Sequence, residues 1–341
     1  MQKRLDLNLS SLFILPKNLY TFKSKYIFGG GFMKRKIVKQ GATTLTVSLP
    51  SKWTKKFRLK SGDEIQVEEK ENQLIIKNSG EFAISKTQLE IDKLPKAIAY
   101  RYLVGAYKKG SDEINVRFSQ YIEDLKTRKK HKTINFIQET INNLIGVEII
   151  EQTKNYCKIK QITNVSEDEF DIVLRRIFLL LLSLSEEAFE IVENNNRNIE
   201  TIENKHNNID KFVNYSIRLL NKKGHAEKTT LYYYLIQELE EMSDAYSFLI
   251  REFVNNKRKI DKKTIDVFKQ VNDSLRTFYE YFYDFKKEKA VKIIKDRRKI
   301  FANINAMPKT HGVEDNLMLS RLAVVVIKIL NLTETRISMI D

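Results

Sequence analysis

Residues 166–194 read SEDEFDIVLRRIFLLLLSLSEEAFEIVEN, and this stretch sets the class of the C-terminal half. Ser166 and Glu169 have the spacing of a capping box, in which two side chains bond backbone N–H groups at the start of a helix. Apolar residues then recur every three or four positions as far as Asn194. The stretch therefore predicts one long helix with an apolar face.

The helical pattern continues to the end of the printed sequence, interrupted by short breaks rich in Asn, Gly, Pro or Lys. We expect six helices, over residues 166–194, 199–220, 227–254, 261–285, 290–307 and 313–340. They fall into two triplets, in residues 165–256 and 257–341. This arrangement predicts tandem three-helix bundles in an all-α half of the chain.

The positive charge lies at the other end of the chain. The net charge is +16, from 60 Lys and Arg against 44 Asp and Glu. Residues 33–60 hold nine basic residues and no acidic one, whereas residues 165–341 hold twenty-nine basic and twenty-eight acidic residues. A Lys-rich composition alone does not readily produce this segregation. It indicates a surface that faces a polyanion, most simply nucleic acid.

Residues 33–80 have the pattern of a small β domain. β-Branched strand segments at 37–38 and 45–49 flank a turn, and a hairpin pattern covers 65–76. A short helix over 51–57 follows Pro50 and places Trp53 on one face with Phe57. We expect Trp53 in the core. One copy of this segment is too small to bury a core, so it predicts an obligate dimer.

Two stretches of this segment resemble the SpoVT/AbrB, or MazE-like, swapped-hairpin family. They are VKQGATTLTVSLP at 38–50 and LKSGDEI at 59–65, and they depart from the family at Ala42, where Asn is frequent. The resemblance implies a homodimer with interleaved hairpins that places basic loops and the first strand on DNA. The residues expected to bind DNA are Lys34, Arg35, Lys36, Lys39, Lys52, Lys55, Lys56 and Arg58.

Residues 81–164 predict a small α/β module. The expected elements are helices over 94–107 and 134–144 and strands over 113–118, 147–150 and 157–159. A basic run lies between Lys126 and Lys132. It is either a solvated loop or a second patch that contacts phosphate.

The helical half, behind an AbrB-like domain, resembles the PhoU family in its archaeal type, whose members regulate phosphate uptake. The matching residues are Ile209-Asp210 and the pair Glu240 and Asp244. Four-residue spacing puts Glu240 and Asp244 on one helix face, and with Asp210 opposite they would hold a divalent or ferric ion. Glu203 and His206 are possible additional ligands. Alternatively, the acids are a solvated helix face and His206 is an inter-helix hydrogen bonder.

The second triplet departs from the pattern of that family. Asp284, Asp296 and Glu334 are isolated acids, and Ala323 and Ile327 stand where acids are required. The sequence therefore predicts no metal site in the second bundle. The apolar runs at 179–184 and 232–234 predict core and interface packing, and the aromatic run at 278–283 is either core or a partner surface.

Several classes of function are disfavoured. The single cysteine, Cys157, excludes an intrachain disulfide and a Cys-based zinc cluster. The richest apolar run, at 177–184, is too short to span a membrane, so we expect a cytoplasmic protein without membrane insertion. No nucleophile elbow, phosphate-binding Gly loop or His-Glu zinc motif is present, so we expect neither enzyme activity nor an organic cofactor.

The sequence thus predicts an α+β multidomain protein. Residues 1–32 are expected to be a disordered extension or a start-site artefact, followed by domains over 33–80, 81–164 and 165–341. The resemblances imply a DNA-binding regulator of phosphate homeostasis that forms a homodimer or higher oligomer. A phosphate transporter ATPase subunit or a signalling protein is a further expected partner. The alternatives are a cytosolic adaptor that damps a phosphate transporter by protein contact, and a metal-dependent enzyme built on the helical carboxylates.

Overall fold

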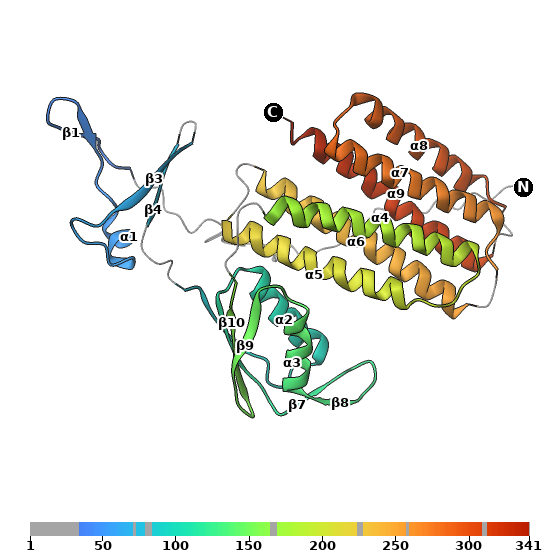
Figure 1. Cartoon of the computed structure of the whole chain (residues 1–341), viewed down its shortest axis with the longest axis horizontal. Coiled ribbons are helices and arrows are strands. Elements are labelled where there is room, and N and C mark those ends of the chain that lie inside the picture. Colours follow the sequence, from blue (N-terminus) through green and yellow to red (C-terminus); the bar gives the residue numbers. More distant parts are fainter. Residues whose placement is uncertain are drawn as a thin grey trace, which may run out of the picture. The chain divides into compact units, whose positions relative to one another are not determined.

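The computed structural model describes residues 34–70, 73–78, 84–163, 169–223, 228–256, 259–308 and 312–340. The chain divides into two compact units, Met1–Ala83 (unit 1) and Ile84–Asp341 (unit 2), which we treat separately (Figure 1). The expected extension at 1–32 and Ser166 of the capping box lie outside the described residues.

Unit 1 consists of two hairpins and a short helix. Its elements are β1 (Val38–Gln40), β2 (Thr44–Thr46), α1 (Ser51–Lys56), β3 (Ile65–Lys70) and β4 (Gln73–Asn78). β1 pairs with β2 in antiparallel register, and Gly41 supplies the positive φ of +77° that the turn requires. The strand expected over 45–49 ends at Thr46. Thr46 pairs with Val38, which is the first residue of β1, so the residues after Thr46 have no partner in that strand.

No residue described in unit 1 is buried. Trp53 was expected in the core, but it is only half-buried and contacts Phe57, at 5.3 Å between ring centroids. This expectation is wrong for the single chain, since two hairpins and a helix of six residues enclose no interior. On the β3–β4 hairpin, one face carries Ile65, Val67, Leu74 and Ile76, and the other is mainly polar.

Unit 2 begins with the α/β module. Its elements are β5 (Lys86–Glu90), α2 (Lys96–Lys108), β6 (Glu113–Arg117), β7 (Tyr121–Glu123), β8 (Lys130–Lys132), α3 (Thr133–Asn142), β9 (Val147–Gln152) and β10 (Tyr156–Gln161). The main sheet has the order β5-β6-β10-β9, with β5 and β6 parallel and the other pairs antiparallel. Ile114, Val116, Cys157 and Ile159 are its buried centre. The basic run at 126–132 forms an exposed turn and then β8, paired with β7.

Six helices follow in the described part of unit 2, within a few residues of the expected ranges. They are α4 (Glu169–Glu193), α5 (Glu200–Lys223), α6 (Thr229–Asn255), α7 (Lys262–Tyr283), α8 (Lys287–Asn305) and α9 (Val313–Ile337). α4, α5 and α6 pack on one another, and so do α7, α8 and α9. The triplets meet where α6 contacts α9 and α4 contacts α7 (Figure 1). The prediction of a helical C-terminal half is confirmed.

The apolar runs divide between core and surface. Phe278 and Tyr281 are fully buried, so most of the aromatic run belongs to the core. Leu179, Tyr233 and Tyr234 were expected to pack, but they lie on the outer faces of α4 and α6 and are exposed. Among the described helices, α9 is long and apolar enough to cross a membrane, although half of its most apolar stretch is buried within the unit. A core helix of a globular bundle has the same features.

Candidate functional site

Unit 1 carries all eight residues that the sequence assigned to DNA, and these eight are here called the basic surface. They are Lys34, Arg35, Lys36, Lys39, Lys52, Lys55, Lys56 and Arg58, and every one is exposed. Three precede β1, one lies on it, three lie on α1 and one follows α1. The last turn of α1 favours cations, since the carbonyl end of a helix carries partial negative charge. A two-stranded ribbon and a helix terminus are both shapes that DNA grooves accept.

A second charged surface, here called the acidic cluster, joins α5 and α6 of unit 2. It consists of His206 and Asp210 from α5 with Glu240 and Asp244 from α6. The Nε2 atom of the buried His206 lies 2.7 Å from Oδ1 of Asp244, and its Nδ1 lies 3.6 Å from Oδ2 of Asp210. Nδ1 is buried without a hydrogen-bond partner. The helices thus bring three of the predicted ligands together.

Glu203, the fifth predicted ligand, lies elsewhere in the hydrogen-bond network. Its two carboxylate oxygens accept hydrogen bonds from Nε and Nη2 of Arg251 at 2.6 and 2.5 Å. This bidentate pairing lowers the pKa of the Glu203 carboxyl. Glu203 therefore stabilises the contact between α5 and α6, and a role as a metal ligand would require it to leave Arg251.

Burial and crowding of like charges raise the pKa values of Asp210 and Glu240. The pKa of Asp210 rises to about 6, chiefly because burial disfavours the charged form, with further contributions from Glu240 and Asp244. The pKa of Glu240 is also raised, first by burial and then by Asp244. Burial alone would lower the pKa of His206, but the hydrogen bond to Asp244 and the charge of Asp210 raise it. The cluster therefore favours added positive charge.

Helix α2 of the α/β module supplies part of that positive charge. The charge of Lys108, at its C-terminal end, opposes the rise in the pKa of Asp210 and of Glu240. Burial, and after it these two acids, raises the pKa of Tyr100. The acidic cluster is therefore close to the α/β module. Sequence reasoning missed this relation, because α2 and α5 are separated by some hundred residues and no local pattern connects them.

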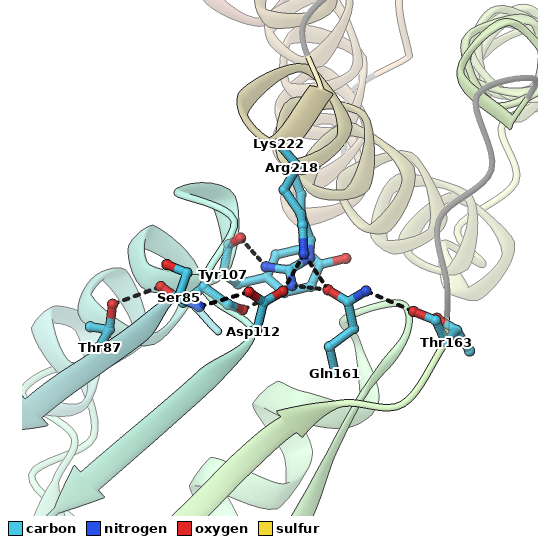
Figure 2. A network of polar contacts seen from close by, with 9 residues as sticks. Ser85, Thr87, Tyr107, Asp112, Gln161, Thr163, Arg218 and Lys222 are labelled. Carbon is cyan, nitrogen blue, oxygen red and sulfur yellow. Dashed lines mark hydrogen bonds and ion pairs between the residues drawn. The ribbon is translucent and has the colours of Figure 1, made fainter. Parts of the chain in front are cut away.

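A network of polar contacts, here called the α2–α5 latch, stabilises the contact between α5 and the C-terminal end of α2 (Figure 2). The guanidinium of Arg218 donates hydrogen bonds to the carbonyls of Tyr107 (2.7 Å) and Ser111 (2.9 Å) and to Oε1 of Gln161 (2.6 Å). Lys222, one turn further along α5, forms an ion pair with Asp112. Arg218 thus supplies the donor for the carbonyl of Ser111 and a second donor for that of Tyr107, which also accepts from the N–H of Gly110.

The end of α2 is shaped for this contact. Gly110 has a φ of +94°, and the N–H groups of Gly110 and Ser111 bond the carbonyls of Tyr107 and Ala106 in a Schellman motif. A Cβ atom at position 110 would lie 2.7 Å from Cγ of Lys222. Glycine is therefore required both for the turn and for the approach of α5.

The acidic cluster fits a metal ion in its chemistry but not in its arrangement. Imidazole and carboxylate donors suit Mn²⁺, Zn²⁺ or Fe, and the unpartnered Nδ1 of His206 is an available donor. However, the described part of the chain contains no group of three or more His, Cys, Asp or Glu side chains placed to hold a metal ion. In the second bundle, Asp284 pairs with Lys286 and Lys289, and Asp296 pairs with Lys292.

Replacing Asp210 with asparagine is expected to stabilise the protein at pH 8. A carboxyl whose folded-state pKa lies above its unfolded value costs stability as pH rises from about 4 through about 6. After allowance for its partial exposure, the gain is about 1–2 kcal/mol, or a few degrees in Tm. Thermal unfolding in chelator should show the gain at pH 8 and its progressive loss from about pH 6 to about pH 4. An equal gain at both ends of this pH range would contradict this account.

Asp112→Asn is the matched control, because the hydrogen bonds from Lys222 and Ser85 outweigh burial and lower the pKa of Asp112. It should destabilise the protein at pH 8.

The same samples test whether the acidic cluster binds a metal ion. A rise in the Tm of the wild type with added Mn²⁺, absent from Asp210→Asn, would support a metal site. Absence of metal by elemental analysis, together with an unchanged Tm with Mn²⁺, Mg²⁺, Zn²⁺ or Fe, would rule it out.

These features define an α+β protein with a small basic β unit and a six-helix half that carries an acidic cluster. No protein-family model matches the chain. No curated protein matches it either. Among solved structures, it is similar to the phosphate transport system regulatory protein PhoU from Streptococcus pneumoniae, with 16% sequence identity and a TM-score of 0.43. That alignment covers 50% of this chain and 92% of the other.

Proposed function

We propose that the protein is a dimeric DNA-binding regulator of phosphate homeostasis. Unit 1 binds DNA, and the helical half of unit 2 senses a signal, binds a metal ion or docks a partner. The observation that carries the DNA-binding part is the basic surface, since all eight cations are exposed in a stretch that contains no acidic residue. We propose no catalytic role, because the sequence contains no recognised catalytic motif.

The phosphate-related part rests on the residues that resemble the PhoU family. It is supported by the proximity of Asp210, Glu240 and Asp244 at the α5–α6 contact. A genome-wide map of DNA occupied by the protein at high and low phosphate tests this part directly. Occupancy of phosphate-uptake genes that changes with phosphate would support it, and occupancy that is independent of phosphate would contradict it.

DNA affinity is expected to fall steeply with salt. Each phosphate that a lysine or arginine neutralises contributes a slope of about −0.9 to the plot of log K against log salt concentration. Arg35→Ala and Lys36→Ala each remove one cation per chain, and hence two per dimer. Each should flatten the slope and weaken binding of a labelled duplex. Fluorescence anisotropy across a salt series measures both quantities.

Lys154→Ala is the control, because Lys154 is an exposed lysine outside the basic surface, in the turn between β9 and β10. It should leave the slope unchanged. Arg35 and Arg58 are the candidates for bidentate contacts to guanine, worth roughly 1–3 kcal/mol of discrimination. Weak, salt-insensitive binding that is equal in wild type, Arg35→Ala and Lys36→Ala would remove the DNA-binding role.

A second candidate function, the adaptor, is supported by the surface of α8. Residues 287–299 hold seven basic and two acidic residues, and Val291 and Ile294 are exposed among them. Such a mixed basic and apolar face suits an acidic protein surface. Retention of the protein on DNA separates the two functions. An adaptor would show no DNA retention and would lose its partner when Lys295 and Arg298 are replaced by glutamate.

A further inference from the structure

Strand β5 leaves one edge of the main sheet open. It is the terminal strand in the order β5-β6-β10-β9, and no other described strand pairs with its outer side. The carbonyl of Ser85 accepts from the N–H groups of Asp112 and Glu113, and the N–H of Ile91 donates to Arg117. These odd-numbered positions face β6. By alternation, the N–H and C=O groups of Lys86, Gln88 and Glu90 point outward.

The sequence of β5 is complementary to itself in antiparallel orientation. The strand reads Lys86-Thr87-Gln88-Leu89-Glu90. A two-fold axis at Gln88 places Lys86 of each copy opposite Glu90 of the other, so opposite charges face each other at both ends. The outward-pointing groups of the same three residues then form the hydrogen-bonded pairs of the ladder. Cross-strand pairs of opposite charge stabilise a sheet, and like charges destabilise it.

The surface beside this edge is largely apolar, with two basic residues in it. Thr87 and Leu89 line a groove with residues of α2 and its C-terminal end, namely Arg101, Tyr102, Gly105, Ala106 and Lys109. Tyr102 is 50% exposed, and the space around Gly105 is open. Ile98 lies one turn before Tyr102 on the same stripe and is also exposed. A second sheet added to β5 would bring the same stripe of a second α2 against this one and cover both.

The opposite edge of the sheet lacks these properties. The pairing of β9 with β10 shifts register between Lys158 and Ile159, which bends this side of the sheet. β9 carries Glu148 and Glu151 and no basic residue. Self-pairing there would bring acids together, so it is disfavoured.

We propose that β5 pairs antiparallel with β5 of a second copy of this chain, joining the two four-stranded sheets across a two-fold axis at Gln88. The pairing is independent of DNA binding. Unit 1 ends one residue before Ile84, so a dimer of unit 1 would hold two β5 strands at high effective concentration. The second interface then fixes the spacing of the two helical halves.

Disulfide cross-linking of the full chain tests this pairing. Gln88→Cys places two thiols on the axis, where opposite Cα atoms of a hydrogen-bonded pair are about 5.5 Å apart, within the range for a disulfide. All cysteine variants carry Cys157→Ala, because Cys157 lies opposite Gln152 in the pairing of β9 with β10 and would form an intrachain disulfide with a cysteine at position 152. Mild oxidation should yield a covalent dimer. Gln152→Cys, on the opposite edge, is the matched control and should cross-link much more slowly.

Charge variants test the register. In the Gln88→Cys background, Lys86→Glu and Glu90→Lys each place like charges opposite each other, and each alone should cross-link roughly fivefold more slowly. The two variants co-expressed with different tags should form the mixed dimer at the original rate, since opposite charges are restored. Equal cross-linking at positions 88 and 152 would overturn the proposal. Failure of Gln88→Cys to form a covalent dimer would also overturn it. That result would mean that another segment of the chain covers the edge of β5.

Discussion

Replacing Arg218 with methionine is expected to lower the free energy of unfolding of unit 2 by about 3–5 kcal/mol. The Arg218 side chain is 1% exposed, and its guanidinium bonds two carbonyls of the α2 terminus and the amide of Gln161. Methionine keeps the apolar stem but loses three hydrogen bonds from a charged group, each worth roughly 1.5–3 kcal/mol. The carbonyl of Ser111 then lacks its donor, whereas Tyr107 keeps the N–H of Gly110 and Gln161 keeps Lys222. Thermal unfolding should show a Tm lower by about 6–20 °C.

Arg276→Met is the matched control for this experiment. Arg276 pairs with Glu186 on the surface, where both side chains are about half exposed, so its loss should cost less than about 1 kcal/mol. Hydrogen exchange should localise the effect of Arg218→Met to the C-terminal turn of α2. A loss as small as that of the control would show that the α2–α5 latch does not stabilise the unit.

Replacing Val67 with aspartate is expected to abolish dimerisation of residues 33–80. Val67 is 56% exposed on the apolar face of the β3–β4 hairpin, and no described residue of unit 1 buries it. In a dimer the Val67 side chain of each copy is buried, and each burial stabilises the dimer by roughly 1.5–3 kcal/mol. The dissociation constant should therefore rise by about two to four orders of magnitude. Analytical ultracentrifugation of the isolated segment measures it.

Gln66→Asp is the control, because Gln66 is the preceding residue of β3, is also exposed and points to the polar face. It should leave the dimer intact. Val67→Asp should lose DNA affinity together with the dimer, because a monomer presents only half of the basic residues. Gln66→Asp should keep the affinity of the wild type. If the wild-type segment is a folded monomer at micromolar concentration, the obligate dimer is wrong.

The helices were predictable and several strands were not. Six long segments with a clear apolar stripe give a strong signal, and α4 to α9 follow it. β5 has only five residues, and three of them are polar or charged with exposed side chains. β7 and β8 have three residues each. Such strands are stabilised by their neighbours in the sheet, so their own sequence carries little information.

The candidate sites likewise contain some features that the sequence predicted and others that it could not predict. Helix geometry predicted that Glu240 and Asp244 share one face, and the resemblance to the PhoU family implied Asp210 opposite them. The pairing of Glu203 with Arg251 and the latch depend on tertiary contacts, the latter across more than a hundred residues. One signal was available. Arg218 lies within the apolar stretch 215–220, where a charged residue requires a specific partner.

The position of Lys108 affects how the acidic cluster responds to ions. Its backbone carbonyl accepts a hydrogen bond from Asn221 at 2.8 Å, and Arg218 holds the adjacent Tyr107, so the ammonium group is tethered near Asp210 and Glu240. A tethered group acts at an effective concentration on the order of millimolar or above. A free divalent cation must compete with this built-in ligand, so weakening the tether would make the acids more available to cations from solution.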